Sequence, residues 1–198
     1  MKPAAAFFLI GTVILSVWHH FSSYEVLLSL AITFGTISYH LIIRLLAALV
    51  IRLAMNNHAD CKKRRYQVGM REMALYQKLK VKKWKGKLPT YDRASFDPQR
   101  HTWEEIAQAT CQSELIHETN VVLSFLPIAA GFRFGAMPVF VVTSVLAALF
   151  DAAFVMMQRY NRQRMMRLLN AQNLTDEKRQ TSDAGQPENT KPTPTPGR

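Results

Sequence analysis

The sequence predicts an all-α integral membrane protein with about four transmembrane helices, arranged as two hairpins around a basic cytoplasmic loop that itself contains helices. The first observation is that apolar residues are pooled in four stretches, at 3–21, 26–43, 121–134 and 137–157. Stretches approaching or exceeding eighteen apolar residues can cross a hydrocarbon core roughly 30 Å thick. The second is that the charged residues, which sum to +11, are pooled between and after these stretches.

The placement of Lys and Arg predicts the orientation. Segment 61–87 carries eleven cations and the single acid Glu72, and four more arginines lie between residues 159 and 167. The short loops at 18–25 and 131–136 hold only Arg133 between them. By the positive-inside rule, both termini and the central loop are cytoplasmic in a multi-pass protein of the inner membrane.

The first stretch is expected to be a retained helix rather than a cleaved signal. It begins after Lys2, as a secretory leader does, but Trp18-His-His-Phe21 occupies the place of a small-residue cleavage site. Together with the second stretch it forms a hairpin over residues 1–55. Its last part, from Arg44 to Met55, is expected to run along the interface with its arginines snorkelling to phosphate depth. Within the second stretch, His40 is expected to be a neutral imidazole hydrogen-bonded between helices.

The basic loop, residues 56–118, contains a run of cations from Lys78 to Lys87, interrupted by Leu79, Val81 and Trp84. The run fits a patch held to anionic lipid, with Trp84 as an interfacial anchor, and it fits equally a site for the phosphates of a soluble donor. A nucleic-acid role ranks last, because no recognised binding module accompanies it. The loop has two cysteines, Cys61 and Cys111, which are expected to be unremarkable thiols on the reducing side of the membrane.

The rest of the loop is expected to be an ordered turn-rich segment at 88–98, followed by a helix. Thr102-Trp-Glu-Glu105 matches a capping box and predicts a helix start there, which makes Glu104 and Glu105 helix-stabilising residues. The helix runs through His117 into the third stretch. That stretch is short, so it is expected to be tilted, re-entrant or only partly inserted unless it borrows neighbouring residues.

The remaining chain divides into two parts. Residues 119–170 form the second transmembrane hairpin and its basic end. Residues 171–198 are rich in polar residues, Gly and Pro, and are expected to be a disordered tail, because they cannot bury enough apolar surface to become ordered.

One candidate for chemistry lies on the helix that begins at Thr102. Glu114 and His117 are three residues apart and share a face, so the carboxylate can hold one ring nitrogen while the other acts as a base near neutral pH. The alternative is a simple ion pair on the helix surface. A metal site formed by Glu114, His117 and His101 lacks any supporting ligand spacing, so no metal is expected.

A second candidate is Gln158-Arg-Tyr-Asn-Arg-Gln-Arg164, which follows the fourth stretch directly. Arginines alone would suffice to stop transfer through the membrane, whereas two carboxamides beside cations could bind a sugar hydroxyl or an acyl carbonyl. Asp151 lies about 10 Å deeper along the same helix, and faces either the bundle interior or a partner such as Arg44 or His40.

Three segments in order, Lys83-Trp-Lys-Gly-Lys-Leu-Pro89, Glu114-Leu-Ile-His117 and Gln158-Arg-Tyr-Asn-Arg-Gln-Arg164, resemble the glycosyl-4,4'-diaponeurosporenoate acyltransferases of bacterial carotenoid synthesis. The similarity covers roughly residues 81–169. It implies a membrane enzyme that transfers a long-chain acyl group to a sugar hydroxyl of a glycosylated carotenoid or similar glycolipid. The motif positions that carry over are Trp84, Lys85, Lys87, Pro89, Glu114, His117, Gln158, Arg159, Tyr160, Asn161 and Arg162.

On this basis His117 and Glu114 are expected to be catalytic, and Trp84, Lys85, Lys87, Gln158, Arg159, Tyr160, Asn161 and Arg162 to bind substrates. Acyl-CoA is the expected donor, and no further cofactor is expected. Its phosphates would lie against the run from Lys78 to Lys87, together with Arg159 and Arg162. Two alternatives stay open: another lipid-modifying membrane enzyme, or a non-enzymatic membrane protein that binds anionic lipid or a partner.

Overall fold

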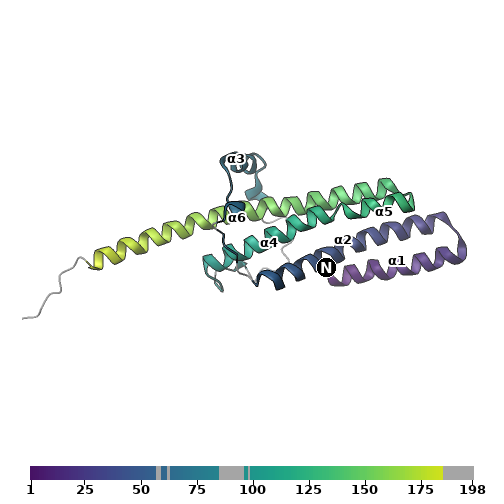
Figure 1. Cartoon of the computed structure of the whole chain (residues 1–198), viewed down its shortest axis with the longest axis horizontal. Coiled ribbons are helices and arrows are strands. Elements are labelled where there is room, and N and C mark those ends of the chain that lie inside the picture. The colour runs from purple at the N-terminus through teal and green to yellow at the C-terminus, as the bar shows by residue number, and fades with distance from the viewer. Residues whose placement is uncertain (57–58, 62, 85–95, 98, 185–198) are drawn as a thin grey trace, which may run out of the picture.

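The computed structural model describes residues 1–56, 59–61, 63–84, 96–97 and 99–184. Within them the protein is all helical, with no strand, as predicted. Its long helices are α1 (Lys2–Ser22), α2 (Glu25–Met55), α4 (Trp103–Leu123), α5 (Leu126–Phe134) and α6 (Met137–Ala184). Figure 1 shows α1 beside α2, and α4 and α5 beside α6, in one elongated bundle.

Four helical units are long and apolar enough to cross a membrane: α1, α2, α4 with α5, and α6. Large apolar side chains such as Phe7, Ile10 and Leu146 are between 58% and 64% exposed along them. A soluble bundle would bury this many apolar side chains, so lipid is the environment that fits the surface. The prediction of four helices long and apolar enough to span a membrane is confirmed.

The first hairpin turns tightly and packs closely. Pro3 lies in the first turn of α1, and Ser23 adopts the left-handed conformation (φ 54°) that ends the helix. A Cβ at Gly11 would lie 2.6 Å from the ring of Phe34, so any larger residue there would force the ring or the helices to shift. Tyr39 then joins this hairpin to the second by donating its hydroxyl to the Leu123 carbonyl at 2.9 Å.

The expected interfacial segment is the last part of one long helix. Helix α2 is continuous from Glu25 to Met55, and Arg44 is paired inside the bundle, which differs from the predicted snorkelling of this side chain. Its side chain is only 14% exposed and pairs with Asp151 on α6. A partner at the same depth satisfies the guanidinium better than lipid phosphates that it would have to stretch to reach.

The helix predicted from Thr102 begins where expected. The Thr102 hydroxyl accepts from the Glu105 N–H at 3.3 Å, and the Glu105 carboxylate accepts from the Thr102 N–H at 2.9 Å, which is the predicted capping box. The helical unit that follows is interrupted only near Ser124, where Pro127 opens α5. Because α4 supplies the residues that the short third stretch lacks, the combined unit is long enough to span.

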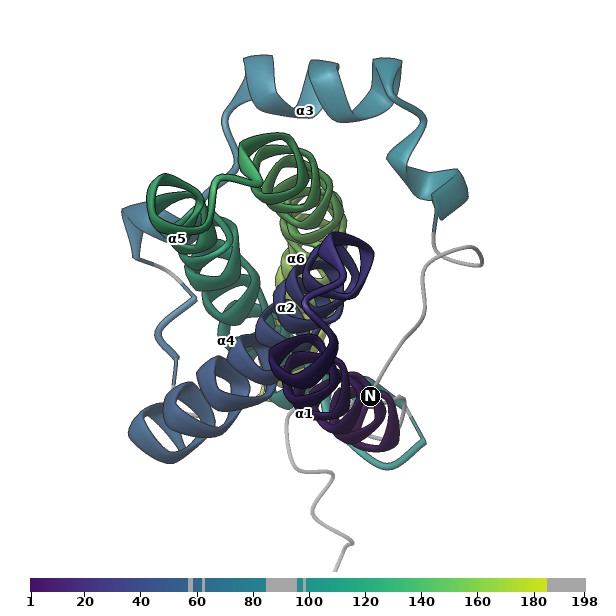
Figure 2. The same cartoon turned by 90° about the vertical axis from the view of Figure 1, so that its right-hand side faces the viewer.

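Between the hairpins lie shorter elements, namely η1 (Arg64–Tyr66), α3 (Met70–Lys78) and η2 (Val81–Trp84). Seen along the bundle in Figure 2, α3 lies across its direction, beyond α5 and α6. Helix α6 continues past residue 170 to Ala184, so part of the segment predicted to lack order is helical. No Gly or Pro interrupts residues 170–184, which explains the continuation. The predicted loop at 88–98 lies almost entirely outside the described residues, which include only Phe96 and Asp97 of it.

Candidate functional site

The centre of the site is a three-residue network on three different helices. His117 of α4 and Asp151 of α6 are hydrogen-bonded, with Nδ1 2.8 Å from Oδ1. Arg44 of α2 donates to the other carboxylate oxygen from Nε at 2.9 Å and from Nη2 at 2.6 Å. The Asp151 side chain is fully buried, and His117 is 20% exposed. The network therefore joins both hairpins at one depth in the bundle.

This network fixes how His117 presents its imidazole. An ionised carboxylate only accepts hydrogen bonds, so Nδ1 carries the proton and donates it to Asp151. The ring of Phe154 stacks on the imidazole, with centroids 4.6 Å apart and planes 10° apart. In the described part of the chain no residue hydrogen-bonds Nε2, which is left as the nitrogen able to take a proton.

Glu114 does not hold His117, which differs from the predicted pairing. Its fully buried carboxylate accepts from Arg159 Nη1 at 2.6 Å and from Arg162 Nη1. The physical reason is that two arginines of α6 face Glu114 across the α4–α6 interface, and burial of a carboxylate favours the strongest available pairing. Asp151 takes the position beside the imidazole that the sequence had assigned to Glu114.

The two arginines are also anchored to the segment before α4. Arg162 donates from Nε and Nη2 to the Tyr66 carbonyl, at 3.1 and 2.6 Å. Arg159 pairs with Glu72 of α3 at 2.5 Å. With side chains 15% and 1% exposed, Arg159 and Arg162 are bound within the protein, and their predicted role at the donor phosphates stays a prediction.

The polar residues predicted on α6, Gln158, Tyr160 and Asn161, differ in how deeply they are buried. Gln158 is 7% exposed and donates to the Ser113 hydroxyl at 3.1 Å. It lies seven residues after Asp151, so both project from one stripe of α6 towards α4. Asn161 and Tyr160 are half-buried. The structure thus brings Gln158 to within about one helical turn of His117, since Ser113 precedes His117 by four residues.

Trp84 reaches the site indirectly. Tyr76, Val81, Phe154 and Met157 form an apolar cluster, against which Trp84 and Tyr160 pack. Because Phe154 also stacks on His117, this cluster connects the basic run to the imidazole. Lys85, Lys87 and Pro89 lie outside the described residues.

Sequence reasoning missed the role of Asp151 as the partner of His117, and it missed Phe154 and Glu72. An acid inside a spanning helix was a usable signal for Asp151, because intramembrane charges are rare and have partners. Phe154 and Glu72 gave no such signal, since a stacking ring looks like any apolar residue and an isolated acid in a basic loop looks solvated. His40 also differs from expectation: it is buried, and neither ring nitrogen has a described partner.

The cysteines are closer than expected. Cys61 and Cys111 are free thiols whose sulfurs lie 2.8 Å apart, although fifty residues separate them. The hydrogen bond with Cys111 lowers the pKa of the Cys61 thiol. Within the described residues, no group of three or more His, Cys, Asp or Glu side chains could hold a metal ion, and His101 pairs with Glu105 instead of joining His117.

Fold and site together define a helical membrane protein with a buried ionic network where its two hairpins meet. Its sequence matches a family model described as glycosyl-4,4'-diaponeurosporenoate acyltransferase over residues 61–171, which is more than half of the chain. The chain belongs to this family and is an acyltransferase of carotenoid biosynthesis. No match was found among curated proteins or among solved structures. The matched range contains η1, α3, η2, α4, α5 and most of α6, and therefore His117, Glu114 and Asp151.

Proposed function

We propose that the protein transfers a long-chain acyl group from acyl-CoA to a sugar hydroxyl of a glycosylated carotenoid at the cytoplasmic face of the inner membrane, and that it needs no further cofactor. The observation that carries the proposal is the His117–Asp151 hydrogen bond, which leaves Nε2 of His117 free beside the α4–α6 interface. The family match supports the acceptor class and acyl transfer.

The reaction is a one-step acyl transfer with His117 as general base. Nε2 takes the proton of the acceptor hydroxyl as its oxygen attacks the thioester carbonyl carbon of the donor. The carbon–sulfur bond breaks, and the departing CoA thiolate takes from the imidazolium the proton that came from the acceptor hydroxyl, which returns His117 to its starting state. Asp151 is a positioning residue: it holds the ring and stabilises the imidazolium, a role that the carboxylate of a Ser-His-Asp triad also has.

The other groups bind the two substrates. Gln158 and Asn161 are proposed to bind the acyl carbonyl or the sugar by amide hydrogen bonds. The phosphates of the donor are proposed to lie against the lysines at 82, 83, 85 and 87, since Arg159 and Arg162 are already paired. Two lysines of this set, Lys82 and Lys83, are exposed.

An apolar cavity supports a long apolar acceptor. It has a volume of about 460 Å³ and lies between the hairpins, with walls that include Ala31, Gly35, Leu126 and Phe140. Leu126 is nine residues beyond His117, which is roughly 14 Å along the helical unit. We propose that the polyene of the acceptor extends from the site towards this cavity, because a chain anchored at His117 must enter the hydrocarbon core.

The His117→Ala variant tests the base. We expect transfer to fall by about 10²-fold or more, because general-base removal commonly costs this much, while the protein still inserts in the membrane. The assay incubates membranes with acyl-CoA and a carotenoid glycoside and detects the ester by mass spectrometry. His101→Ala is the matched control, since His101 is exposed and, among the described residues, pairs with Glu105 on the surface of the same helix start. Unchanged turnover of His117→Ala would exclude the mechanism.

The Asp151→Asn variant tests the positioning role. Asn can donate to Nδ1 and stabilise the wrong tautomer, so we expect kcat to fall by about 10²-fold or more with little change in the KM for acyl-CoA. Asp97→Asn, which removes a partly exposed acid paired with Arg100 and outside this network, should leave both constants unchanged. A rise in KM with kcat unchanged would show that Asp151 contributes to donor binding and does not act through His117.

A further inference from the structure

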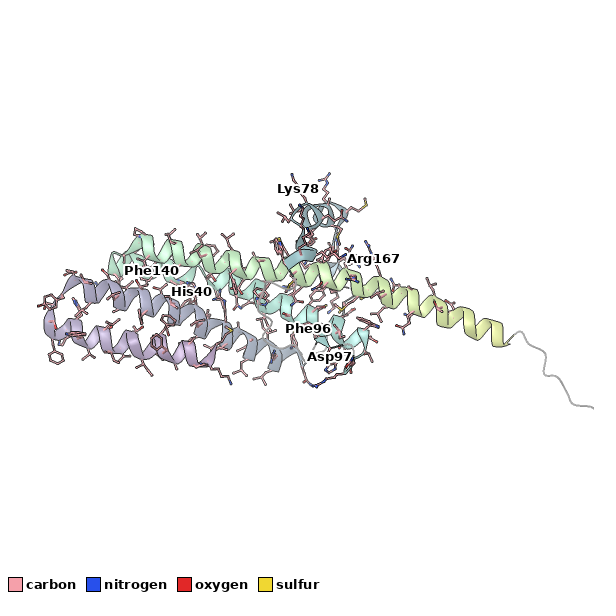
Figure 3. The ribbon with its side chains drawn as sticks, turned by 180° about the vertical axis from the view of Figure 1, so that it is seen from behind. His40, Lys78, Phe96, Asp97, Phe140 and Arg167 are labelled. Carbon is pink, nitrogen blue, oxygen red and sulfur yellow. The ribbon has the colours of Figure 1, made fainter. Side chains whose placement is uncertain are left out.

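Helix α3 presents an exposed surface that the proposed reaction does not use. We name the α3 platform by its residues Met70, Arg71, Leu75, Lys78, Leu79 and Lys80. All three apolar members are exposed, at 92% for Met70, 50% for Leu75 and 41% for Leu79. The three cations are exposed as well. Figure 3 shows Lys78 on the side of α3 that faces away from the bundle.

The platform is fixed at the level where the apolar part of α6 ends. The opposite face of α3 contributes Tyr76, which packs with Val81 against Phe154 and Met157. These two residues are in the last turn of the apolar stretch of α6, and Gln158 and Arg159 follow directly. Glu72 of α3 pairs with Arg159. The helix is therefore held at the boundary between the spanning region and the basic end of the protein.

The orientation of α3 fits a bilayer surface. Figures 1 and 2 show α3 crossing the bundle direction and lying outside the outline of the spanning helices. A helix perpendicular to spanning helices lies parallel to the membrane plane. Because α3 projects beyond α6, a bilayer around the spanning helices would bring the lipids of one leaflet beside it.

The positive charge of the platform is not neutralised by any acid in the part of the chain that the structure describes. Glu72 is the only acid of segment 61–87, and Arg159 and the hydroxyl of Tyr76 bind its carboxylate. Among the described residues, none forms an ion pair with Arg71, Lys78 or Lys80. Cations interleaved with exposed apolar side chains on a short helix are typical of interfacial helices that bind anionic lipid.

We propose that the α3 platform binds the headgroups of anionic phospholipids in the leaflet on its own side, while Met70, Leu75 and Leu79 enter the interface. The occupant is a lipid surface, because a soluble phosphate would use the cations but leave the three apolar side chains in water. Near a membrane surface each cation contributes about fivefold to the preference for anionic lipid. Glu72 and Tyr76 would transmit a docked position of α3 to Arg159 and Phe154.

Fluorescence quenching by brominated lipids tests the proposal. The full chain carrying Trp18→Phe and Trp103→Phe retains Trp84, four residues beyond Lys80 of the platform, as its only tryptophan. In bilayers that contain a minor fraction of brominated lipid, we expect brominated phosphatidylglycerol to quench Trp84 several-fold more effectively than brominated phosphatidylcholine. The triple variant Arg71→Gln, Lys78→Gln, Lys80→Gln should lose this preference.

The control removes three other exposed cations from the same end of the molecule: Lys63→Gln, Arg164→Gln, Arg167→Gln. It should keep the preference. Inorganic phosphate at millimolar concentration, added as a soluble competitor, should not displace the brominated phosphatidylglycerol. Equal quenching by both lipids, an equal loss of preference in the control, or displacement by phosphate would each overturn the proposal, and none of these outcomes depends on acyl transfer.

Discussion

Asp151 is a fully buried carboxylate within a membrane-spanning helix, and all three hydrogen bonds to it come from ionisable side chains. A charge at such a place is costly unless it is paired and hydrogen-bonded. Arg44 neutralises the carboxylate from α2, and His117 uses its remaining oxygen. Removing Arg44 would leave the buried carboxylate with His117 as its one partner among the described residues, so Arg44 supplies the charge that makes an ionised Asp151 tolerable at this place.

The buried carboxylate of Glu114 connects helices and does not pair with His117. Its carboxylate joins Arg159 and Arg162, and Arg162 in turn holds the Tyr66 carbonyl of η1. The cluster thus connects α4, α6 and the segment before α3. We infer a structural role for Glu114 that the predicted pairing with His117 did not include.

The Glu114→Ala variant should therefore be strongly destabilised. It leaves Arg162, 1% exposed, without a carboxylate, and breaking a buried pair in this way costs about 3–5 kcal/mol. Reversible unfolding in mixed micelles measures the change in free energy. Glu118→Ala is the matched control, because Glu118 is a partly exposed residue of the same helix whose pair with Arg65 should contribute less than about 1 kcal/mol. Equal stability of the two variants would contradict the inferred role.

Among the helices, the features that local sequence patterns predicted correctly are those that depend on residues close together in the chain. The capping box at Thr102 and the four apolar helices were predicted, because both depend on residues close in the chain. The course of α2 beyond Ile43 was not, because the partner that keeps Arg44 in the bundle is 107 residues away. The continuation of α6 to Ala184 was not predicted either, since composition averaged over 171–198 concealed a helical segment without Gly or Pro.

The attachment of α3 to α6 should depend on pH. Burial alone raises the pKa of Glu72, but hydrogen bonds from Arg159 and Tyr76 outweigh it and hold the pKa below its usual 4.5. The pairing therefore contributes stability that is fully present above pH 4.5 and is lost as the pH falls through the lowered pKa. We expect Trp84 fluorescence to report release of α3 in this range. The Glu72→Gln variant should show no such transition, and an identical transition in both proteins would assign it to another group.

At the scale of the whole molecule, the site exists because two hairpins meet. The sequence predicted that polar side chains of the third and fourth stretches gather at the basic end, and the fold does bring His117 and Gln158 to one interface. The sequence named Arg44 as one candidate partner for Asp151. It could not single out Arg44 from the other candidates, because helix packing decides which spanning helices are neighbours. The first hairpin contributes Arg44 directly, so removing it should remove part of the site.

The arrangement of the bundle predicts the topology. Figure 1 shows the turns between α1 and α2 and between α5 and α6 at one end, and the basic elements towards the other. With eleven cations in segment 61–87, that end should face the cytoplasm. In a Cys61→Ser, Cys111→Ser background, an impermeant maleimide added to right-side-out vesicles should label Ser23→Cys and Ala136→Cys but not Arg167→Cys. Because acyl-CoA is cytoplasmic, labelling of Arg167→Cys alone would place His117 beyond the reach of its donor, and the proposed reaction would fail together with the orientation.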